Sequence, residues 1–427
     1  MKPSGIEWIG DIPDDWEVRR LKGLGEQTIG LTYSPQDITD NSGTLVLRSS
    51  NIQNGKLVLD RDDNVYVSID VENKILKDED ILICSRNGSR NLVGKTAFVI
   101  TYGKKLSYGA FTTIFRSKYN KFLFYVFNAG VFEYHLASYN TSTINQLTTS
   151  MLNEIRVPFP PVKTQQKIAD YLDEKCGEID ATIAKQKESI EKLKAYKQSL
   201  ISETVTKGLD KSAPLKPSGI DYLGDIPSHW EIKKLKFVAN FNQNTLPEDT
   251  DGQFELKYID IGNVSSVDGI KEIQYFNFSN APSRARRIVK YGDIIVSTVR
   301  TYLRAITSIK EDYDNCICST GFAVITPKDN FQQDFVVYAI ENESFIAQII
   351  ANSQGISYPA INVSQLENLK LAFPSVKEQK EIVDFLKTKL LEIDLTINKK
   401  QNIIQKLDAY KKSLIFECVT GKCSILG

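Results

Sequence analysis

Residues 164–202 read TQQKIADYLDEKCGEIDATIAKQKESIEKLKAYKQSLIS, and this stretch decides the fold. Its apolar residues recur at alternating steps of four and three, the spacing of positions a and d in a heptad repeat. The stretch contains no proline and one glycine, so we predict one long helix. Its seam positions are Leu172, Cys176, Ile179, Ile183, Gln186, Ile190, Leu193, Lys197 and Leu200.

The same register returns near the end of the chain. Even the polar interruptions match, because Gln186 corresponds to Lys400 and Lys197 to Lys411. Two such seams in one chain most simply bury each other, and we predict an intramolecular coiled coil in which the polar seam positions hold the register. Alternatively, each helix packs on its own domain as ordinary core. The second seam is Leu386, Leu390, Ile393, Ile397, Lys400, Ile404, Leu407, Lys411 and Leu414.

A tandem duplication underlies this match. Residues 2–22 read KPSGIEWIGDIPDDWEVRRLK, and residues 216–236 read KPSGIDYLGDIPSHWEIKKLK. The offset of 214 residues between these leaders also relates the two helices, and two such copies span essentially the whole chain of 427 residues. In each copy we expect a turn that leads into a short strand or helix, a body of about 135 residues, and a proline-marked start of the long helix.

Both bodies are rich in β-branched and aromatic runs that are separated by turn residues, so we predict an α+β fold. Helical stretches follow at 121–135 and 331–350, and Asn54-Gly55 and Asn87-Gly88 are hairpin-type turns. The bodies differ far more than the leaders and helices do, which suggests two different targets held at a fixed geometry. The predicted strands are 44–47, 57–59, 65–68, 81–84, 97–100, 112–115, 256–261, 273–278, 294–298 and 323–326.

The composition is that of a globular protein, with 41% hydrophobic and 25% charged residues and a net charge of zero. No secretory leader or long apolar run is apparent, and six scattered cysteines suit reduced thiols, so we expect a cytoplasmic protein. Cys316 and Cys318 form a lone C-x-C, and with only two histidines in the chain we predict no zinc site.

Net neutrality hides a segregation of charge. Residues 81–132 contain eight lysines and arginines and no acidic residue, and residues 284–310 contain seven such cations and only Asp293. One-signed segments with interleaved Tyr, Asn, Ser and Thr are typical of surfaces that read a phosphate backbone and base edges. A single run of this kind is often only a solvated face, but its occurrence in each body favours nucleic acid.

Two loops that follow apolar strands are the best candidates for base reading, because arginine pairs bidentately with guanine and asparagine with adenine. They are residues 85–91 and 297–304, and the stretches 139–145 and 353–362 are either further recognition loops or ordinary turns. The predicted DNA contacts are Arg48, Ser50, Asn51, Arg86, Asn87, Ser89, Arg90, Asn91, Lys95, Thr141, Thr143, Asn263, Arg284, Arg286, Arg287, Thr298, Arg300, Thr301, Tyr302, Arg304, Ser357 and Tyr358.

No catalytic motif is complete. Residues 89–96 approach a Walker A loop, but a β run follows where a helix must begin. Pro247-Glu248 followed by Glu255-Leu256-Lys257 approaches the carboxylate–lysine pattern of metal-dependent nucleases, but the spacing is short and the surroundings are turn-like. The sequence contains no N-P-P-Y/F tetrapeptide and no Gly-rich cofactor loop for base methylation. His135 and His229 have no nearby Ser–Asp or Cys arrangement suited to nucleophilic catalysis. We therefore predict a non-catalytic chain.

The duplicated G-x-I-P-x-x-W-E-(V/I)-basic-basic-L leader resembles that of the specificity subunits of type I restriction–modification systems. The D-I-L/I strand, the P-x-P start of the helix, and the E-I-D-x-x-I helix that ends in K-x-S-L-I are similar as well. The resemblance covers the whole chain. It implies target-recognition domains at 1–160 and 211–374, and conserved helices at 161–210 and 375–427.

The resemblance further implies that each recognition domain reads one half of a split, asymmetric site in double-stranded DNA. The helices then form an antiparallel coiled coil that sets the gap between the half-sites. They also dock two modification subunits, which carry S-adenosylmethionine and methylate adenine. Two restriction subunits join them to form an ATP-dependent nuclease, so ATP and Mg are expected on partners and no cofactor on this chain. The alternative is a non-catalytic protein-binding scaffold with two divergent recognition domains.

A helix of about 39 residues is about 58 Å long at ~1.5 Å per residue. Antiparallel pairing is then expected to place the bodies at opposite ends, each facing a major groove about one helical turn (~10 bp) from the other.

Overall fold

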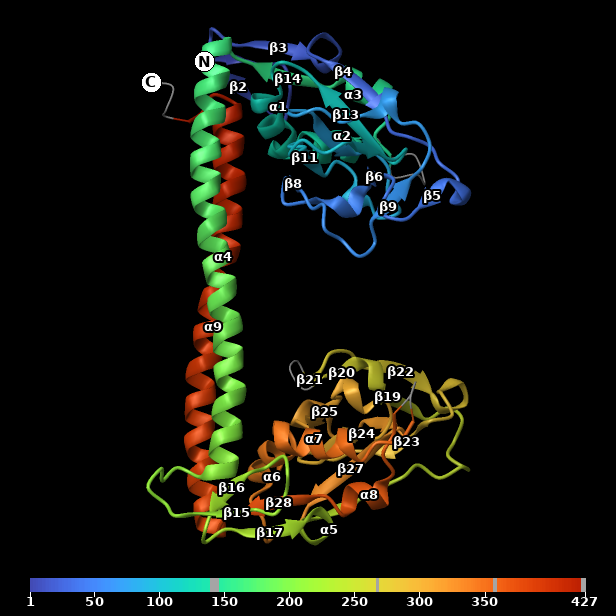
Figure 1. Cartoon of the computed structure of the whole chain (residues 1–427), viewed down its shortest axis with the longest axis vertical. Helices are drawn as coiled ribbons and strands as arrows, with labels where there is room; N and C mark the ends of the chain where they lie inside the picture. The colour runs from blue at the N-terminus through green and yellow to red at the C-terminus, as the bar shows by residue number, and fades with distance from the viewer. Residues whose placement is uncertain (139–145, 266–268, 356–358, 424–427) are drawn as a thin grey trace. The chain divides into compact units, whose positions relative to one another are not determined.

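The computed structural model describes residues 1–138, 146–265, 269–355 and 359–423 (Figure 1). The chain divides into two compact units. Unit 1 comprises residues 1–187 and 401–427, and unit 2 comprises residues 188–400. Each unit therefore holds one body together with about half of each long helix.

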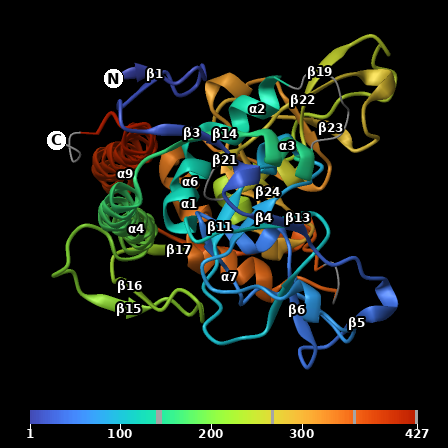
Figure 2. The same cartoon turned by 90° about the horizontal axis from the view of Figure 1, so that it is seen from above.

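The two predicted helices are present and longer than expected, as α4 (Val162–Lys207) and α9 (Val376–Val419). They run side by side in Figure 1 and appear as adjacent circles when viewed end on in Figure 2. In unit 1 the seam residues Leu172 and Ile183 of α4 share a buried cluster with Leu414 of α9. In unit 2 the α4 residue Ile201 shares a cluster with Leu386 and its neighbours on α9. The predicted coiled coil is confirmed.

An ion pair crosses the seam in each unit. In unit 1 the Lys411 ammonium lies 2.6 Å from the Asp180 carboxylate, and in unit 2 Lys197 lies 2.7 Å from Asp394. The pairing is antiparallel, because Leu172 packs near the end of α9 while Asp180 reaches back to Lys411. The lysines that interrupt the apolar seam thus find opposite charges on the facing helix.

The body of unit 1 contains two four-stranded sheets. The first is antiparallel in the order β11-β10-β13-β4, and the second has the order β12-β6-β9-β5, with β12 parallel to β6. The first comprises β4 (Glu26–Ile29), β10 (Ile81–Cys84), β11 (Thr96–Phe98) and β13 (Thr112–Arg116), and the second comprises β5 (Ile38–Thr39), β6 (Thr44–Leu47), β9 (Val65–Val67) and β12 (Leu106–Tyr108).

Helices α1 (Asn120–Val126), α2 (Phe132–Ser138) and α3 (Thr149–Glu154) complete this body. The helix predicted over 121–135 is interrupted between α1 and α2, because Gly130 adopts a φ of +86° that the helix does not allow. The smaller pairs are β1 (Lys2–Pro3) with β2 (Asp11–Ile12), and β7 (Ile52–Gln53) with β8 (Lys56–Leu57).

The body of unit 2 repeats the first sheet in the same order, as β25-β24-β27-β18. Its second sheet, β22-β19-β26-β23, repeats three strands of its counterpart, but the fourth strand joins at the other edge, beside β26. The strands are β18 (Ala239–Phe241), β24 (Ile294–Ser297), β25 (Ile306–Ser308), β27 (Phe322–Pro327), β19 (Glu255–Ile259), β22 (Gln274–Asn277), β23 (Ala285–Ile288) and β26 (Ile317–Ser319).

This body also holds four helices within the described residues, and the helix predicted over 331–350 divides into α6 and α7. The helices are α5 (Leu235–Val238), α6 (Gln333–Ile340), α7 (Glu343–Ala351) and α8 (Val363–Glu367). The short strand pairs are β15 (Leu215–Pro217) with β16 (Asp225–Pro227), and β20 (Val264–Ser265) with β21 (Gly269–Ile270).

The leaders attach each body to the helices. Strand β3 (Glu17–Arg20) pairs with β14 (Arg156–Phe159), which runs directly into α4, and β17 (Glu231–Lys234) pairs with β28 (Lys370–Phe373), which runs into α9. Trp16 and Trp230 precede these leader strands and are fully buried. The Trp230 indole N–H also donates to Glu378 in the first turn of α9, at 3.0 Å. The duplicated leader therefore connects each body to a long helix.

One of the two predicted hairpin turns is wrong. Asn54 and Gly55 have φ values of +50° and +78° and connect β7 to β8 as a two-residue turn, as predicted. In contrast, Asn87 uses its side-chain oxygen to accept from the Ser89 N–H at 3.0 Å. This local bond starts a longer loop with a 3₁₀ turn at Arg90–Leu92, so no tight hairpin forms between β10 and β11.

The seam ion pair in unit 1 gives a test of helix register. We expect Lys411→Asp to lower the free energy of unfolding by about 1 kcal/mol, because a second carboxylate then faces Asp180. Adding Asp180→Lys restores the pair in reverse and should recover most of the loss. Denaturant unfolding of the two variants and the parent protein measures this coupling, and additive losses in the double variant would contradict the register.

Glu341, which follows α6, gives a pH-dependent test. Burial raises the pKa of its carboxyl to about 7, against a smaller lowering by Lys197 and Lys310. The folded state thus keeps a proton that the unfolded state releases, so the free energy of unfolding falls as the pH rises from about 4.5 to about 7. Glu341→Gln should remove this dependence and stabilise the protein by about 2 kcal/mol at pH 8. Equal shifts with the exposed Glu311→Gln would refute the assignment.

Candidate nucleic-acid interface

In unit 1 the loop after β10 is held by the turn between β12 and β13. The backbone N–H groups of Ser85 and Arg86 both donate to the Phe111 carbonyl, each at 3.0 Å, and Thr113 donates its hydroxyl to Ser85 at 3.0 Å. The Arg86 guanidinium lies over the Phe111 ring, 5.3 Å from its centroid, and that ring is 60% exposed. Arg86 is thereby presented at the surface on an aromatic platform.

The structure brings several predicted residues of this body together. The Asn87 amide donates to the Ser49 hydroxyl at 3.1 Å, and the Lys95 ammonium donates to the Ile52 carbonyl at 3.5 Å. Arg86 also forms a single β-bridge with Gln146. Three segments distant in sequence thus meet around the end of β10. The predicted contacts Thr141 and Thr143 lie outside the described residues.

Arg48 and Asn51, two of the predicted residues at 48–51, bond to other residues of the same body. The Arg48 guanidinium lies 3.1 Å from the Asp63 carboxylate, and the Asn51 side chain is buried. Asn51 donates to the Val58 carbonyl and the Asn64 side chain, both at 2.9 Å, and accepts from the Arg48 N–H at 2.9 Å. These bonds fix residues 48–64 of the body. In the loop after β10, by contrast, Ser89, Arg90 and Asn91 are exposed. The Ser50 hydroxyl is buried and has no hydrogen-bond partner.

In unit 2 the turn between β26 and β27 has the corresponding role. Thr298 donates both its N–H and its hydroxyl to the Gly321 carbonyl at 2.8 Å, and the Thr320 N–H donates to the Arg284 carbonyl at 2.8 Å. This turn therefore links both basic segments of the body. A Cβ on Gly321 would lie only 2.5 Å from Ile261, so glycine allows the turn to approach the segment that contains Asn263.

Strand β23 carries two of the predicted arginines, Arg286 and Arg287, and Arg284 directly precedes it. A β-bulge between Ala285 and Arg287 interrupts the regular alternation of the strand, and the Arg286 guanidinium lies 4.6 Å from the centroid of the Phe278 ring. Arg284 is exposed. Burial lowers the pKa of Arg287, and its Nε atom has no hydrogen-bond partner. A cation–aromatic pair thus recurs in the second body on different elements.

The loop after β24 contains the other predicted contacts of unit 2. Thr301 is buried and its hydroxyl lies 2.8 Å from that of Ser353, whereas Arg300 and Tyr302 are exposed. The loop lies beside residues 359–361, because the Ile361 N–H donates to the Thr298 carbonyl at 2.8 Å. The predicted contacts Ser357 and Tyr358 lie outside the described residues.

The charge segregation seen in the sequence is weaker in the structure. Arg116 donates to both carboxylate oxygens of Asp80, at 2.7 and 2.5 Å, and this bonding raises the pKa of Arg116. Arg304 likewise lies 2.6 Å from Glu343, outside its own basic segment. The acidic partners lie just outside the cationic runs in sequence, as Asp80 does, or far from them, as Glu343 does. Exposed arginines of the predicted set remain in both bodies, as Arg86 and Arg90 in unit 1 and Arg284 and Arg300 in unit 2.

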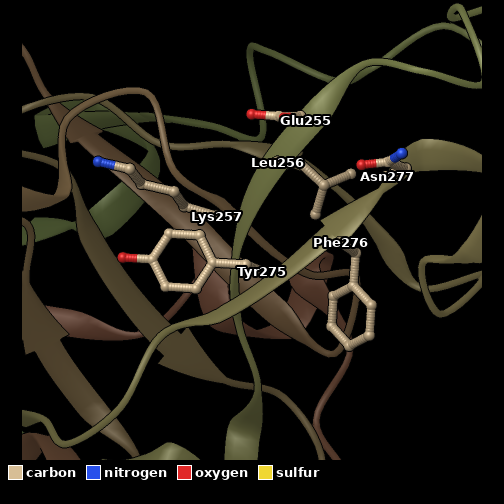
Figure 3. Close-up of a pocket in the computed structure, with 6 residues that line it drawn as sticks. All are labelled: Glu255, Leu256, Lys257, Tyr275, Phe276 and Asn277. Atoms are coloured by element: carbon tan, nitrogen blue, oxygen red, sulfur yellow. The ribbon is translucent and has the colours of Figure 1, made fainter.

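A shallow depression of about 370 Å³ lies on β19 and β22 (Figure 3). Lys257 and Tyr275 face each other across these strands, and Figure 3 shows both side chains on the same side. Among the residues that the structure describes, no three His, Cys, Asp or Glu side chains gather to hold a metal ion, at Glu255 or elsewhere. Thr96 begins strand β11, so residues 89–96 lack the helix that a phosphate loop requires.

Sequence reasoning missed the aromatic residues Phe111, Phe278 and Tyr275. Each is an aromatic residue near a basic one in space: Phe111 below Arg86, Phe278 below Arg286, and Tyr275 opposite Lys257. Only the strand register brings these partners together, because they lie 8 to 25 residues apart. Within the same described ranges, no helix is long and apolar enough to span a membrane.

Comparison with known proteins gives a consistent result. The family model described as type I restriction modification DNA specificity domain matches residues 13–194 and 227–406. The putative type I restriction enzyme MjaX specificity subunit of Methanocaldococcus jannaschii is 25% identical over 98% of this chain and 96% of its own length. The MjaVIII specificity subunit of the same organism is 23% identical over 97% of this chain and 94% of its own length.

Solved structures share the fold. A chain from a study of complex assembly and conformational transition of the type I R-M system aligns with a TM-score of 0.68 and 15% identity, over 97% of this chain and all of its own. The HsdS subunit from Thermoanaerobacter tengcongensis aligns with a TM-score of 0.51 and 15% identity, over 97% of this chain and 98% of its own. The similarity extends over both units.

Corresponding asparagines in the two bodies give a matched test. Asn51 and Asn263 each end a 3₁₀ turn after the second strand of the second sheet. We expect Asn51→Ala to destabilise unit 1 by about 2 kcal/mol and to speed hydrogen exchange across 48–64, because buried backbone and side-chain groups lose their partners. Asn263→Ala should cost less than about 1 kcal/mol, because its amide nitrogen has no partner to lose. Equal effects would contradict this account.

Proposed function

This chain belongs to the family of type I restriction–modification DNA specificity subunits, and from this premise we propose that it is the sequence-specific DNA-binding subunit of such a complex. Each body reads one half of a bipartite, asymmetric site in double-stranded DNA. The coiled coil of α4 and α9 sets the gap between the half-sites. Recognition is assigned to residues 1–160 and 211–374, and connection to residues 161–210 and 375–427.

One observation carries this proposal. In each unit a single turn, at 109–111 or 319–321, holds the basic loop that follows the central strand β10 or β24. Each body also places an arginine over an aromatic ring near this turn. A rigid scaffold that exposes arginine and polar side chains from loops is suited to base edges and phosphates. The two bodies build this surface from different residues, as two different half-sites require.

The proposal leaves the chemistry to partner subunits. Two modification subunits dock on the helices and carry S-adenosylmethionine for adenine methylation, and two restriction subunits supply the ATP- and Mg-dependent nuclease. The complex acts in the cytoplasm. The cleavage step is assigned to the restriction subunits.

The exposed arginines of the two loops give the test. Arg86→Ala and Arg300→Ala should each weaken binding to the selected DNA site by about 1–3 kcal/mol, and each should relax specificity in one half-site only. Arg20→Ala is the matched control, because Arg20 is exposed but lies on the leader strand β3 and pairs with Glu154. Binding is measured by titration of labelled duplexes at fixed salt concentration.

Footprinting of the reconstituted complex should show two protected clusters separated by an unread gap. A single continuous site would contradict the bipartite reading. Unchanged DNA affinity in both arginine variants would instead favour a protein-binding scaffold with two recognition domains.

A further inference from the structure

A short 3₁₀ turn after β24, at Thr301–Leu303, is an unusual feature of unit 2. Arg300 and Arg304, which flank this turn, have φ values of +50° and +52°. Among the described residues only seven non-glycine residues have a positive φ, and two of the seven are the residues that flank this turn. Left-handed backbone in residues other than glycine costs on the order of 1 kcal/mol each and often occurs at binding sites. The surrounding structure must therefore hold this turn in place.

Three contacts to residues 343–359 hold the turn in place. The Thr301 hydroxyl lies 2.8 Å from the Ser353 hydroxyl, and its N–H donates to the Pro359 carbonyl at 3.4 Å. The Arg304 guanidinium lies 2.6 Å from Glu343, in the first turn of α7. Because Thr301 is only 4% exposed while its two neighbours in the turn face solvent, the turn is a rigid support for those neighbours.

The neighbours are the apolar side chains of Tyr302 and Leu303, which are 53% and 46% exposed. Two adjacent exposed apolar residues gain nothing from this position in the free protein, and a chain reversal alone would be easier to form with glycine at the strained positions. They lie within the loop that the turn at 319–321 links to the exposed Arg284. The position of this apolar pair is thus fixed on the proposed DNA-reading surface.

We propose that Tyr302 and Leu303 form an apolar reader that contacts the C5-methyl group of a thymine in the major groove. Thymine is the one base of unmodified DNA that offers a methyl group there, and apolar side chains are its usual partners. The nearby arginines would read hydrogen-bonding groups and phosphates, so the pair adds a recognition element that charge cannot supply. This inference rests on the proposed function and deepens it, because it names a feature of the half-site that unit 2 reads.

The test removes the methyl group alone. The full chain selects its sites from random duplex DNA, and the half-site that Arg300→Ala relaxes is assigned to unit 2. Each thymine of that half-site is then replaced by deoxyuridine. At one position the loss of the methyl should weaken binding to the parent protein about four-fold, the equivalent of one buried methyl group. Either Leu303→Ala or Tyr302→Ala removes the side chain that contacts this methyl group. In that variant, replacement of the thymine by deoxyuridine should leave binding unchanged.

The controls are Tyr291→Ala and Leu215→Ala, which remove side chains that are 61% and 51% exposed elsewhere in unit 2 and should keep the methyl dependence. The inference is overturned if the half-site contains no A·T pair, or if deoxyuridine weakens both variants and the parent equally. It is also overturned if the fluorescence of 2-aminopurine placed in the half-site shows that Tyr302 and Leu303 insert between bases while binding does not depend on the thymine methyl group. A chain that selects no sequence refutes the proposed function itself, whereas selection without methyl coupling refutes only this inference.

Discussion

The structure depends on the mutual burial of two heptad seams that belong to one chain. Each long helix carries an apolar stripe that would face water without the other, and tandem duplication supplies the partner in the same molecule. The lysines that interrupt the stripes meet aspartates across the seam, Lys411 with Asp180 and Lys197 with Asp394. These contacts favour one register and one direction in each unit, and in each unit the leader strand and the buried Trp16 or Trp230 attach the body to its own helix segments.

The two bodies show how one scaffold acquires two reading surfaces. The first sheet has the same strand order in both units, and in both a tight turn holds the loop after the central strand. The fourth strand of the second sheet differs: β5 joins β9 in unit 1, whereas β23 joins β26 in unit 2. Strand β23 brings Arg286 over Phe278, while unit 1 places Arg86 over Phe111. Both bodies thus contain an arginine over an aromatic ring, but on different elements.

Features of the fold that depend on local patterns could be predicted from the sequence. Heptad spacing predicts α4 and α9, and apolar runs predict strands such as β6 and β10 with correct bounds. The hairpin turn predicted at Asn87-Gly88 is wrong, because the Asn87 side chain accepts from the Ser89 N–H and this local bond competes with the hairpin. Interruptions at Gly130 and between α6 and α7 divide helices that periodicity alone would continue.

The candidate site could be predicted only in part. Basic segments and loop positions are visible in the sequence, but their partners come from distant parts of the chain. Asp80 pairs with Arg116 and Asp63 pairs with Arg48, and these pairings neutralise part of the positive charge. The internal bonds of Asn51 and the aromatic supports of the arginines also depend on strand register, which one sequence does not reveal.

The central claim is that each body reads its own half-site while the coiled coil holds the two in place. Exchange of residues 211–374 for the corresponding body of another specificity subunit tests it most directly, with adenine methylation mapped across the genome of a host that also expresses the modification subunits. The account predicts that one half of the recognised site changes, while the other half and the gap between them are preserved. A change in both half-sites, or no change in either, would contradict it.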